Sequence, residues 1–325
     1  MIITRTPFRI SFAGGGTDLA SYYRTHDGGA VTSAAIGRYM HILVSTKFEG
    51  TIRAAYSRTE NVEHVDQLQH ELIREAMRVT GVTRGIEIHA VADIPGEGTG
   101  LGSSSSMTVG LLQALYAFGG ILKDPAELAQ EAAAIEIDRL GGTLGKQDHY
   151  IAAFGGVQYF EFRPDESVRV SPIPIVPSAR AALGEHLSLF FTGQTRRAGG
   201  LLDSQSARTQ ENAPALDRMK ELAREARDAI LRSDFRALGA ILDEGWTLKR
   251  GLTAGISSST IDALYAKAKA AGAWGGKISG AGGGGFLLLV HPPSATRQLE
   301  EALAPMPRTS VRISAEGSRI LFVGR

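Results

Sequence analysis

One glycine- and serine-rich stretch, residues 95–106, carries the clearest chemical signal in this sequence. It reads Pro-Gly-Glu-Gly-Thr-Gly-Leu-Gly-Ser-Ser-Ser-Ser and joins a strand-like run, residues 86–92, to a helix-like run that begins at Met107. Glycines let the backbone turn tightly, and serines at a helix N-terminus bring N–H groups and hydroxyls into one concavity, where an anion is favoured. We therefore predict a phosphate-binding loop formed by Gly98, Gly100, Leu101, Gly102, Ser103, Ser104, Ser105 and Ser106.

The alternative for residues 95–106 is a flexible turn with a serine-rich helix cap. Linkers rich in glycine and serine do not normally stand between an alternating strand and an apolar helix, so we favour phosphate binding. The stretch lacks the Gly-Lys-Ser/Thr ending of a P-loop, and it does not match the Gly-x-Gly-x-x-Gly pattern that precedes a ribose-binding acid. It therefore predicts a nucleotide-dependent kinase site of another design.

Two carboxylates stand where the backbone could bring them to such a site. In residues 14–18, Gly-Gly-Gly-Thr-Asp, the glycines allow a ligand to approach closely and Asp18 stands at the start of the next helix. Asp148 lies in residues 141–150, two positions after Lys146, whose charge would keep it ionised. A carboxylate can receive a proton only from a group within hydrogen-bond reach. The alternatives are a simple helix N-cap for Asp18 and an exposed ion pair for Lys146 and Asp148.

A third acid and a pair of arginines complete the candidates. Glu136 lies in the apolar run Ala-Ile-Glu-Ile of a helix that starts at Asp124, so it is either a surface residue or a deliberately buried acid. Arg196 and Arg197 follow a strand-like run and either bind a second, non-transferred phosphate or face solvent. Residues 275–286 form a glycine run that leads straight into a strand, which indicates a structured loop rather than slack.

Three of these stretches together resemble the GHMP kinases, which are the galacto-, homoserine, mevalonate and phosphomevalonate kinases. Residues 95–104 are similar to the central motif Pro-x-x-x-Gly-Leu-Gly-Ser-Ser, with a loop longer than in that motif. Residues 277–285 are similar to the third motif, Lys-x-x-Gly-x-Gly-x-Gly-Gly, and residues 7–18 to the first motif of the family's sugar kinases. The resemblance spans nearly the whole chain and implies an enzyme that uses ATP and Mg²⁺.

The resemblance also implies roles for individual residues. Arg9 would lie near the transferred phosphoryl group, Asp18 would bind sugar hydroxyls, and Asp148 would be the general base or would at least orient the acceptor hydroxyl. Glu136 would hold Mg²⁺ with one loop serine, and the third motif would pack against the phosphate-binding loop. The serine candidates are Ser104 first, then Ser103 and Ser105. Further substrate contacts would come from Gly15, Gly16, Thr17, Gly282 and Gly283, with Lys146 assisting the base.

The first motif points to a particular acceptor. Gly15 and Gly16 stand where the galactokinases have Glu and His, and this form resembles the bacterial heptose-phosphate kinases and the related fucokinases. The resemblance implies phosphorylation of the anomeric O1 of D-glycero-α-D-manno-heptose 7-phosphate, toward nucleotide-activated heptose for lipopolysaccharide or capsule. The alternatives are an L-fucose or other hexose 1-kinase and a catalytically silent nucleotide- or sugar-binding regulator. The presence of Ser104, Glu136 and Asp148 argues against the silent regulator.

Composition limits the class of protein. The chain has 325 residues, of which 43% are hydrophobic and 21% charged, and it has no cysteine. These values are typical of a globular protein and exclude disulfides, thiolate catalysis and cysteine-bound metal. The net charge of +1 gives no general attraction to nucleic acid or to an anionic membrane. No apolar run is long enough to span a membrane and no signal pattern opens the chain, so we expect a cytoplasmic protein. The sequence leaves a homodimer open.

The elements that must position these residues indicate an α+β protein with two domains. The boundary falls in the proline-interrupted residues 163–184, which gives domains at 1–175 and 176–325. The resemblance implies a GHMP kinase fold, with a ribosomal-protein-S5-like domain 2 fold followed by a ferredoxin-like fold and the active cleft between them. Sequence patterns predict strands at 1–11, 28–36, 40–46, 52–57, 86–92, 152–160, 187–191, 287–290, 311–314 and 320–323. They predict helices at 64–79, 107–115, 124–137, 216–231, 235–248 and 260–271.

Overall fold

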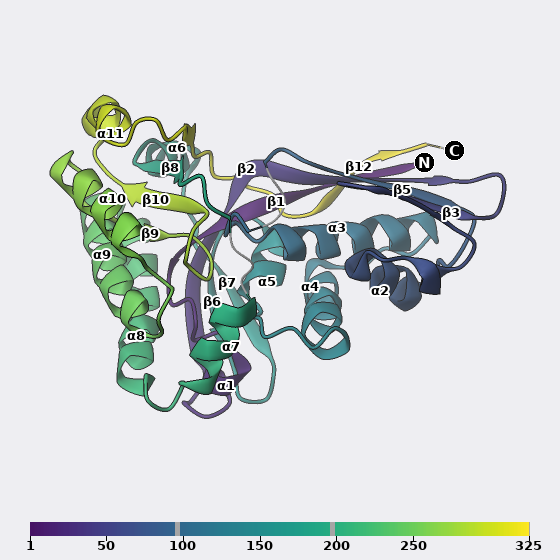
Figure 1. Cartoon of the computed structure of the whole chain (residues 1–325), viewed down its shortest axis with the longest axis horizontal. Helices are drawn as coiled ribbons and strands as arrows, with labels where there is room; N and C mark the ends of the chain where they lie inside the picture. Colours follow the sequence, from purple (N-terminus) through teal and green to yellow (C-terminus); the bar gives the residue numbers. More distant parts are fainter. Residues whose placement is uncertain (95–97, 196–198, 325) are drawn as a thin grey trace.

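The structure is a computed structural model that describes residues 1–94, 98–195 and 199–324. It is an α+β protein with two sheets (Figure 1). Helices from the first half of the chain cover one face of the larger sheet, and most helices from the second half lie with the smaller sheet. The α+β architecture predicted from the sequence is confirmed.

The larger sheet has eight strands in the order β12-β1-β2-β5-β3-β4, with β6 paired to β2 and β7 to β6. Its strands are β1 (Ile2–Ala13), β2 (Gly29–Thr46), β3 (Ile52–Ala55), β4 (Thr59–Val62), β5 (Ile86–Ala92), β6 (Val157–Phe162), β7 (Val168–Pro172) and β12 (Arg319–Val323). β2 is 18 residues long and pairs with β5 through residues 40–46 and with β6 through residues 29–34. A single strand therefore connects both arms of the sheet.

We predicted two separate strands on either side of Gly37 and Arg38. This prediction is wrong, because both stretches belong to β2. The register between β1 and β2 shifts between Pro7 and Phe8, directly opposite this point. The Gly37 N–H donates a hydrogen bond to the carbonyl of Arg312, 2.7 Å away. Gly37 and Arg38 thus form a bulge that bends one strand, and the glycine does not mark a hairpin turn.

Four helices of the first half pack together beneath the larger sheet in Figure 1. They are α2 (Glu71–Thr80), α3 (Ser103–Phe118), α4 (Pro125–Ala133) and α5 (Gln147–Phe154). α3 contacts β1 and β2 and also α2, α4 and α5, so it is the central helix of this half. Its side chains from Ser105 to Leu112 are all buried, which explains why the sequence there is apolar on every side.

Two predicted elements of this half change type or length. Residues 147–154 form α5, so the strand predicted at 152–160 begins only at Val157. Gly155 and Gly156 separate the two elements, and both have positive φ, which ends the helix. The helix predicted at 64–79 is divided into a short 3₁₀ turn, Val65–Gln67, and α2.

The smaller sheet has four antiparallel strands in the order β11-β8-β10-β9. They are β8 (Leu187–Phe191), β9 (Gly275–Ile278), β10 (Phe286–Val290) and β11 (Arg308–Ser310). The helices of this half include α8 (Ala213–Leu231), α9 (Phe235–Gly251), α10 (Ser259–Ala270) and α11 (Thr296–Ala302). Numbered along the chain, the strand order is 4-1-3-2 within a βαββαβ pattern, which is the ferredoxin-like arrangement.

Several elements lie outside the sequence prediction. They are α1 (Ala20–Tyr23), α6 (Pro177–Glu185), α7 (Gly199–Ala207), α11, β4, β7 and β9, and β11 replaces the strand predicted at 311–314. α6 begins at Pro177, because the fixed φ of proline suits the first helical position. The prolines of this region, which suggest an irregular chain in the sequence, therefore mark the ends of regular elements. The division of the chain at residue 175 remains a prediction, and β12 of the second half pairs with β1 of the first.

Candidate active site

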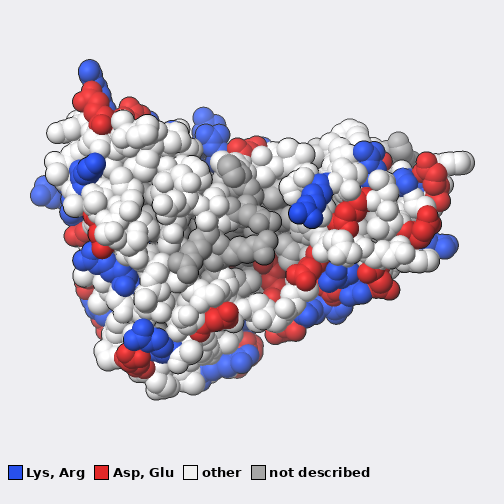
Figure 2. Space-filling view, viewed as in Figure 1, with Lys and Arg blue, Asp and Glu red and all other residues white. Residues whose placement is uncertain are grey.

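A cavity of about 1570 Å³ lies between the two halves of the chain. Its walls come from β1, α3 and α5 on one side and from α9, β9 and the loop after β9 on the other. Pockets for one small ligand usually measure roughly 300–1,000 Å³, so this cavity has room for two. On the face shown in Figure 2, the described Lys and Arg side chains are interspersed with Asp and Glu side chains. The charged groups of the cavity therefore do not belong to a larger patch of one charge on this face.

The N-terminus of α3 opens into this cavity. Gly98, Gly100, Gly102 and the hydroxyl-bearing Ser103, Ser104 and Ser105 line the wall there. Gly102 precedes the helix with φ +76°, and a Cβ at that position would lie 3.1 Å from Cγ of Arg9 and 3.3 Å from Oδ2 of Asp148. Only glycine fits both the backbone conformation and the space, and the N-terminus of the helix is thereby directed at the cavity.

Two members of the predicted phosphate-binding loop face the protein instead. Leu101 is buried, and its carbonyl accepts a hydrogen bond from the Arg9 N–H at 3.0 Å. Ser106 is also buried, and its hydroxyl donates to the carbonyl of Pro7 at 2.9 Å. These two residues hold the start of α3 against β1. Pro95, Gly96 and Glu97, at the start of the loop, lie outside the described residues.

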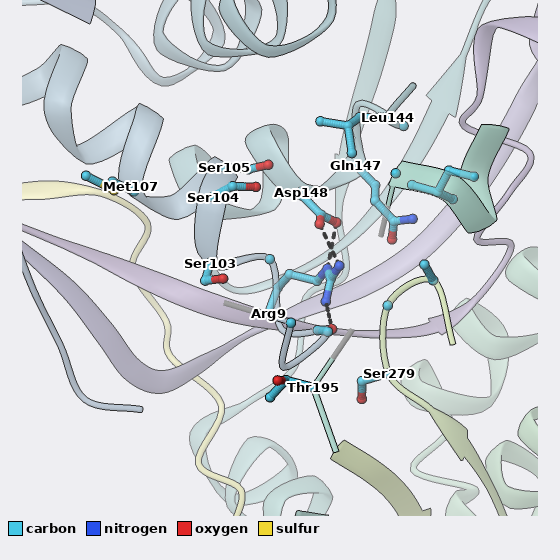
Figure 3. A pocket seen from close by; sticks show the side chains of 18 of the residues that line it. Arg9, Ser103, Ser104, Ser105, Met107, Leu144, Gln147, Asp148, Thr195 and Ser279 are labelled. Carbon is cyan, nitrogen blue, oxygen red and sulfur yellow. Dashed lines mark hydrogen bonds and ion pairs between the residues drawn. The ribbon is translucent and has the colours of Figure 1, made fainter. Parts of the chain in front are cut away.

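An ion pair between Arg9 and Asp148 stands at the centre of the cavity (Figure 3). Nε of Arg9 donates to Oδ1 of Asp148 at 2.6 Å, and Nη2 donates to Oδ2 at 2.5 Å. The remaining nitrogen, Nη1, donates to the carbonyl of Gly100 at 2.5 Å. The two parallel bonds fix the carboxylate plane, and the third ties the guanidinium to the phosphate-binding loop. β1, α5 and the loop therefore meet at one buried arginine.

Asp18 lies in the same cavity, 3% exposed. Its Oδ1 accepts from the Gly16 N–H at 2.9 Å, and its Oδ2 accepts from Nε2 of Gln147 at 3.0 Å. Burial raises the pKa of Asp18, and the negative charge of Asp148 adds to the rise, against the lowering effect of these hydrogen bonds. Gly145 leaves the space that the carboxylate occupies, since a Cβ there would lie 1.8 Å from Oδ2.

Thr17 has a different place from the one that the sequence suggests. Its hydroxyl donates to the carbonyls of Gly14 and Ala30 at 2.8 and 2.9 Å and accepts from the Ala30 N–H at 3.0 Å. The side chain is completely buried and is not part of the cavity wall. Thr17 thus closes the turn that positions Asp18, while Gly15 and Gly16 line the cavity.

Lys146, which we expected beside Asp148, points elsewhere. Its ammonium donates to Oε2 of Glu166 at 2.6 Å and lies 5.2 Å from the ring centre of Tyr23. Lys146 and Asp148 are two residues apart at the start of α5, and residues at that spacing do not face each other on a helix. Arg9, not Lys146, is the cation that pairs with Asp148.

Glu136 is a buried acid, 4% exposed, in a π-helical turn, Ala134–Arg139, that follows α4. Its Oε1 accepts from the hydroxyl of Thr108 at 2.9 Å and lies 3.1 Å from Nε2 of His149. Burial is the largest single effect and lowers the pKa of His149, but the charge and hydrogen bond of Glu136, with smaller effects of Asp148 and Lys146, together raise the pKa. Thr108 also donates to the carbonyl of Ser104, so Glu136 lies one turn of α3 below the loop serines.

Two lysines without a predicted role complete the opposite wall. Lys249 in α9 and Lys277 in β9 are each 6% exposed and line the cavity. The Lys249 ammonium donates to the carbonyl of Gly280. Burial, and to a smaller extent the positive charge of Arg9, lowers the pKa of Lys249 to about 8. Lys277 is the first residue of the third motif, so this motif could have identified it as a site residue. Lys249 lies in no motif that could have done so.

The third motif packs against the phosphate-binding loop, as predicted. The Phe286 N–H donates to the carbonyl of Thr99 at 3.2 Å, and a Cβ at Gly100 would lie 2.3 Å from the carbonyl oxygen of Ser279. Gly282 lines the cavity, whereas the Gly283 N–H donates to the carbonyl of Ile256 at 2.9 Å. Glycines on both loops allow this close approach. Arg196 and Arg197 lie outside the described residues.

Comparison with known proteins agrees with this geometry. The model of the GHMP kinases N terminal domain matches residues 67–156, and that of the GHMP kinases C terminal domain matches residues 226–307. The D-glycero-alpha-D-manno-heptose 7-phosphate kinase of Campylobacter jejuni is 30% identical over 316 residues, 93% of this chain and 93% of that protein. The bifunctional fucokinase/GDP-fucose pyrophosphorylase of Arabidopsis thaliana is 24% identical over 335 residues, 94% of this chain and 31% of that protein.

A solved structure shows the same fold. The crystal structure of a D-glycero-D-manno-heptose 1-phosphate kinase from Bacteroides thetaiotaomicron superimposes with a TM-score of 0.84 at 26% identity and covers 100% of both chains. None of the helices in the described part of this chain is long and apolar enough to cross a membrane. The chain matches the models of both GHMP kinase domains, and it contains the three motifs and the cleft between them. It belongs to the GHMP kinase family.

Proposed function

We propose that this sugar kinase of the GHMP family transfers the γ-phosphoryl group of ATP to the anomeric O1 of D-glycero-α-D-manno-heptose 7-phosphate. The observation that carries the proposal is the Arg9–Asp148 pair, which lies in one cavity with Asp18 and with the open N-terminus of α3. The choice of acceptor is supported by the similarity to the heptose-phosphate kinases of C. jejuni and B. thetaiotaomicron.

The chain's own residues divide the work between nucleotide and acceptor. The N–H groups and hydroxyls at the start of α3, with Ser103, Ser104 and Ser105, bind the phosphates of ATP. Phosphoryl transfer needs positioning and charge neutralisation more than covalent help, and Arg9 supplies positive charge beside the loop. Asp18 accepts hydrogen bonds from the sugar and fixes its orientation.

Asp148 accepts the proton of the acceptor hydroxyl. As the acceptor oxygen forms a bond to the γ-phosphorus, the bond from that phosphorus to the oxygen bridging to ADP breaks, and the hydroxyl proton passes to the Asp148 carboxylate. The two bonds from Arg9 hold the carboxylate in one orientation while it acts. Without a positioned acceptor of that proton, the attacking oxygen would have to carry it into the transition state.

The proposed metal site uses Ser104 and Glu136. Among residues 1–94, 98–195 and 199–324 there is no group of three or more His, Cys, Asp or Glu side chains that could hold a metal ion, so the site would have to include hydroxyls and phosphate oxygens. A serine hydroxyl in the cavity wall and a buried carboxylate one helical turn below it are hard oxygen donors that suit Mg²⁺. When bound, Mg²⁺ neutralises charge on the phosphates of ATP.

The test is ADP release with Mg-ATP and a panel of acceptors, followed by phosphorus NMR of any product. The panel contains heptose 7-phosphate, free heptose, mannose, L-fucose, galactose and mevalonate. We expect a strong new anomeric phosphate signal with heptose 7-phosphate, a much weaker one with free heptose and none with the other acceptors. Faster turnover of L-fucose or of another unphosphorylated sugar than of heptose 7-phosphate would replace the acceptor but keep the kinase. ATP binding without turnover of any acceptor would contradict the proposed function and favour a silent regulator.

A further inference from the structure

Two buried cations stand in the cavity wall that faces the Arg9–Asp148 pair. Lys277 lies in β9, which packs against α9, where Lys249 is found. Gly275 of β9 faces α9, since a Cβ there would lie 1.9 Å from the carbonyl oxygen of Gly239. Side chains alternate along a strand, so Lys277, two residues later, is directed to the same side. The two lysines therefore converge from neighbouring elements.

The protein leaves these cations incompletely neutralised. Among the described residues, no hydrogen bond or ion pair involves the Lys277 ammonium, and Lys249 binds only a carbonyl, that of Gly280. The nearby acids are engaged elsewhere, Asp148 with Arg9 and Asp18 with backbone and amide N–H groups. Burial first, and then the charges of Lys249 and Arg9, lower the pKa of Lys277. Burying a positive charge without a partner costs free energy, and a bound anion would reduce that cost.

Polar atoms without partners lie in the same wall. The hydroxyl of Ser279 and Nε2 of Gln205 are buried and have no hydrogen-bond partner within the part of the chain that the structure describes. Both residues line the cavity, with 3% and 2% of their surface exposed. Buried polar groups are nearly always satisfied in native proteins, so two orphaned groups that face one cavity indicate a ligand. A hydroxyl and an amide N–H can both donate to an anion.

The wall belongs to the acceptor's side of the cavity. A Cβ at Gly16, in the turn that carries Asp18, would lie 2.4 Å from Nε2 of Gln205, so the orphaned amide borders the proposed sugar site. In Figure 3, the loop serines Ser104 and Ser105 lie on one side of Arg9 and Ser279 lies on the other. An anion beside Ser279 is therefore separated from the phosphates that α3 would bind.

We propose that Lys249 and Lys277, together with Ser279 and Gln205, bind a phosphate group that the acceptor already carries, apart from the hydroxyl that becomes phosphorylated. This inference rests on the proposed sugar kinase activity and names the residues that make it specific for a sugar phosphate. The same phosphate chemistry could instead come from the transferred γ-phosphoryl group of ATP. The experiment must separate these two sources.

The test compares wild-type protein with Lys277→Met and with Lys267→Met, which removes an exposed lysine of α10. Each protein is titrated by calorimetry with heptose 7-phosphate and with free heptose, and kcat and KM are measured for both sugars at saturating ATP. We expect Lys277→Met to weaken binding of heptose 7-phosphate about 10- to 100-fold, the range of one or two charge-assisted hydrogen bonds. Free heptose, kcat and the Lys267→Met control should remain at wild-type values.

Several outcomes would overturn the inference while the kinase stands. A fall in kcat of Lys277→Met that is the same for both sugars would assign the lysine to the transferred phosphoryl group. Wild-type protein that binds both sugars equally would show that there is no phosphate subsite. If the double variant Arg196→Ala/Arg197→Ala loses the preference for heptose 7-phosphate and Lys277→Met keeps it, the arginines hold that phosphate instead.

Failure of the proposed function would look different. Wild-type protein would then turn over no acceptor, and calorimetry alone would decide the inference. Tighter binding of heptose 7-phosphate than of free heptose, lost in Lys277→Met and kept in Lys267→Met, would still support the subsite. Absence of that difference would contradict both proposals. Thermal unfolding of Lys277→Met should occur no lower than in wild type, because the change removes a buried cation, so misfolding can be recognised.

Discussion

The two walls of the cavity treat charge in opposite ways. On the N-terminal wall, Arg9 and Asp148 neutralise each other through two short hydrogen bonds, and Asp18 is held by the Gly16 N–H and by Gln147. On the C-terminal wall, Lys249 and Lys277 are buried with lowered pKa values. The charged groups of the first wall, which we call the complete wall, have partners before any ligand arrives. Those of the second, the incomplete wall, would be neutralised by an anion. Catalytic geometry and acceptor selection are thus separable, and mutations can test them one at a time.

The largest expected effect comes from breaking the complete wall at its base. Asp148→Ala should lower kcat by about 10²-fold or more while ATP affinity stays near that of wild type, because it removes the proposed proton acceptor and leaves the start of α3 intact. Steady-state kinetics and a nucleotide-binding titration measure the two quantities. Glu211→Ala is the matched control, since it removes a similar two-bond pair with Arg208, at 2.7 and 2.9 Å, on the exposed surface. An Asp148→Ala enzyme with wild-type kcat would rule out this role.

A smaller effect is expected from displacing the other acid of that wall. In Gly145→Ala the new methyl group would lie 1.8 Å from Oδ2 of Asp18, so the carboxylate must move. We expect kcat/KM for the acceptor to fall by up to about 10²-fold, with KM for ATP unchanged. Gly251→Ala serves as control because a Cβ there meets nothing within 4 Å. If both variants behave alike, the position of Asp18 does not matter for the acceptor.

The incomplete wall should respond to pH. Lys249 has a pKa lowered to about 8 by burial and by Arg9, with Asp18 and Asp148 opposing the shift. A lysine loses its positive charge above its pKa, so kcat/KM for a phosphorylated acceptor should fall as pH rises through about 8, by about tenfold. The ratio of kcat/KM for heptose 7-phosphate to that for free heptose, measured from pH 6.5 to 9.5, isolates this effect. A ratio that does not vary with pH would contradict it.

The smallest expected effect concerns the support beneath the complete wall. The pKa of His149 is raised above 6.5 by the nearby charges of Glu136 and Asp148, against burial. The stability from this pair is fully present below pH 6.5 and is lost as the pH rises through the raised pKa. Denaturant titrations should therefore show the free energy of unfolding decreasing with pH in wild type and less so in His149→Gln. An equal slope in both proteins would show that His149 does not titrate in this way.

Much of the complete wall could be predicted from the sequence, because its residues lie in local motifs. Arg9 and Asp18 lie in the stretch that resembles the first motif of the family's sugar kinases, and Asp148 follows the glycines of residues 141–145. The structure brings all three into one cavity. Lys146 could not be placed, because sequence proximity to Asp148 does not reveal that a helix turns the two side chains apart. Likewise, Gly37 indicated a turn, but whether a glycine ends a strand or bends it depends on pairing with a partner strand.

The incomplete wall could not be predicted in the same way. Lys249 stands in the last turn of α9, beside Arg250, where basic residues commonly interact with the helix C-terminus. Only the packing of α9 on β9 shows that this lysine is buried and directed into the cavity. Gln205 lies in α7, which has no amphipathic pattern, so neither the helix nor the unpartnered amide of Gln205 could be predicted.

The π-helical turn that carries Glu136 makes chain length, as well as residue type, matter at this site. The Leu140 N–H bonds to the carbonyl of Ile135 at 3.0 Å, five residues earlier, so the turn holds one residue more than an α-helical turn of the same height. Deleting one residue just before Glu136 would rotate its side chain by about 100° about the helix axis and withdraw it from Thr108 and His149. In related sequences, substitutions should therefore be tolerated in this turn far more often than insertions or deletions.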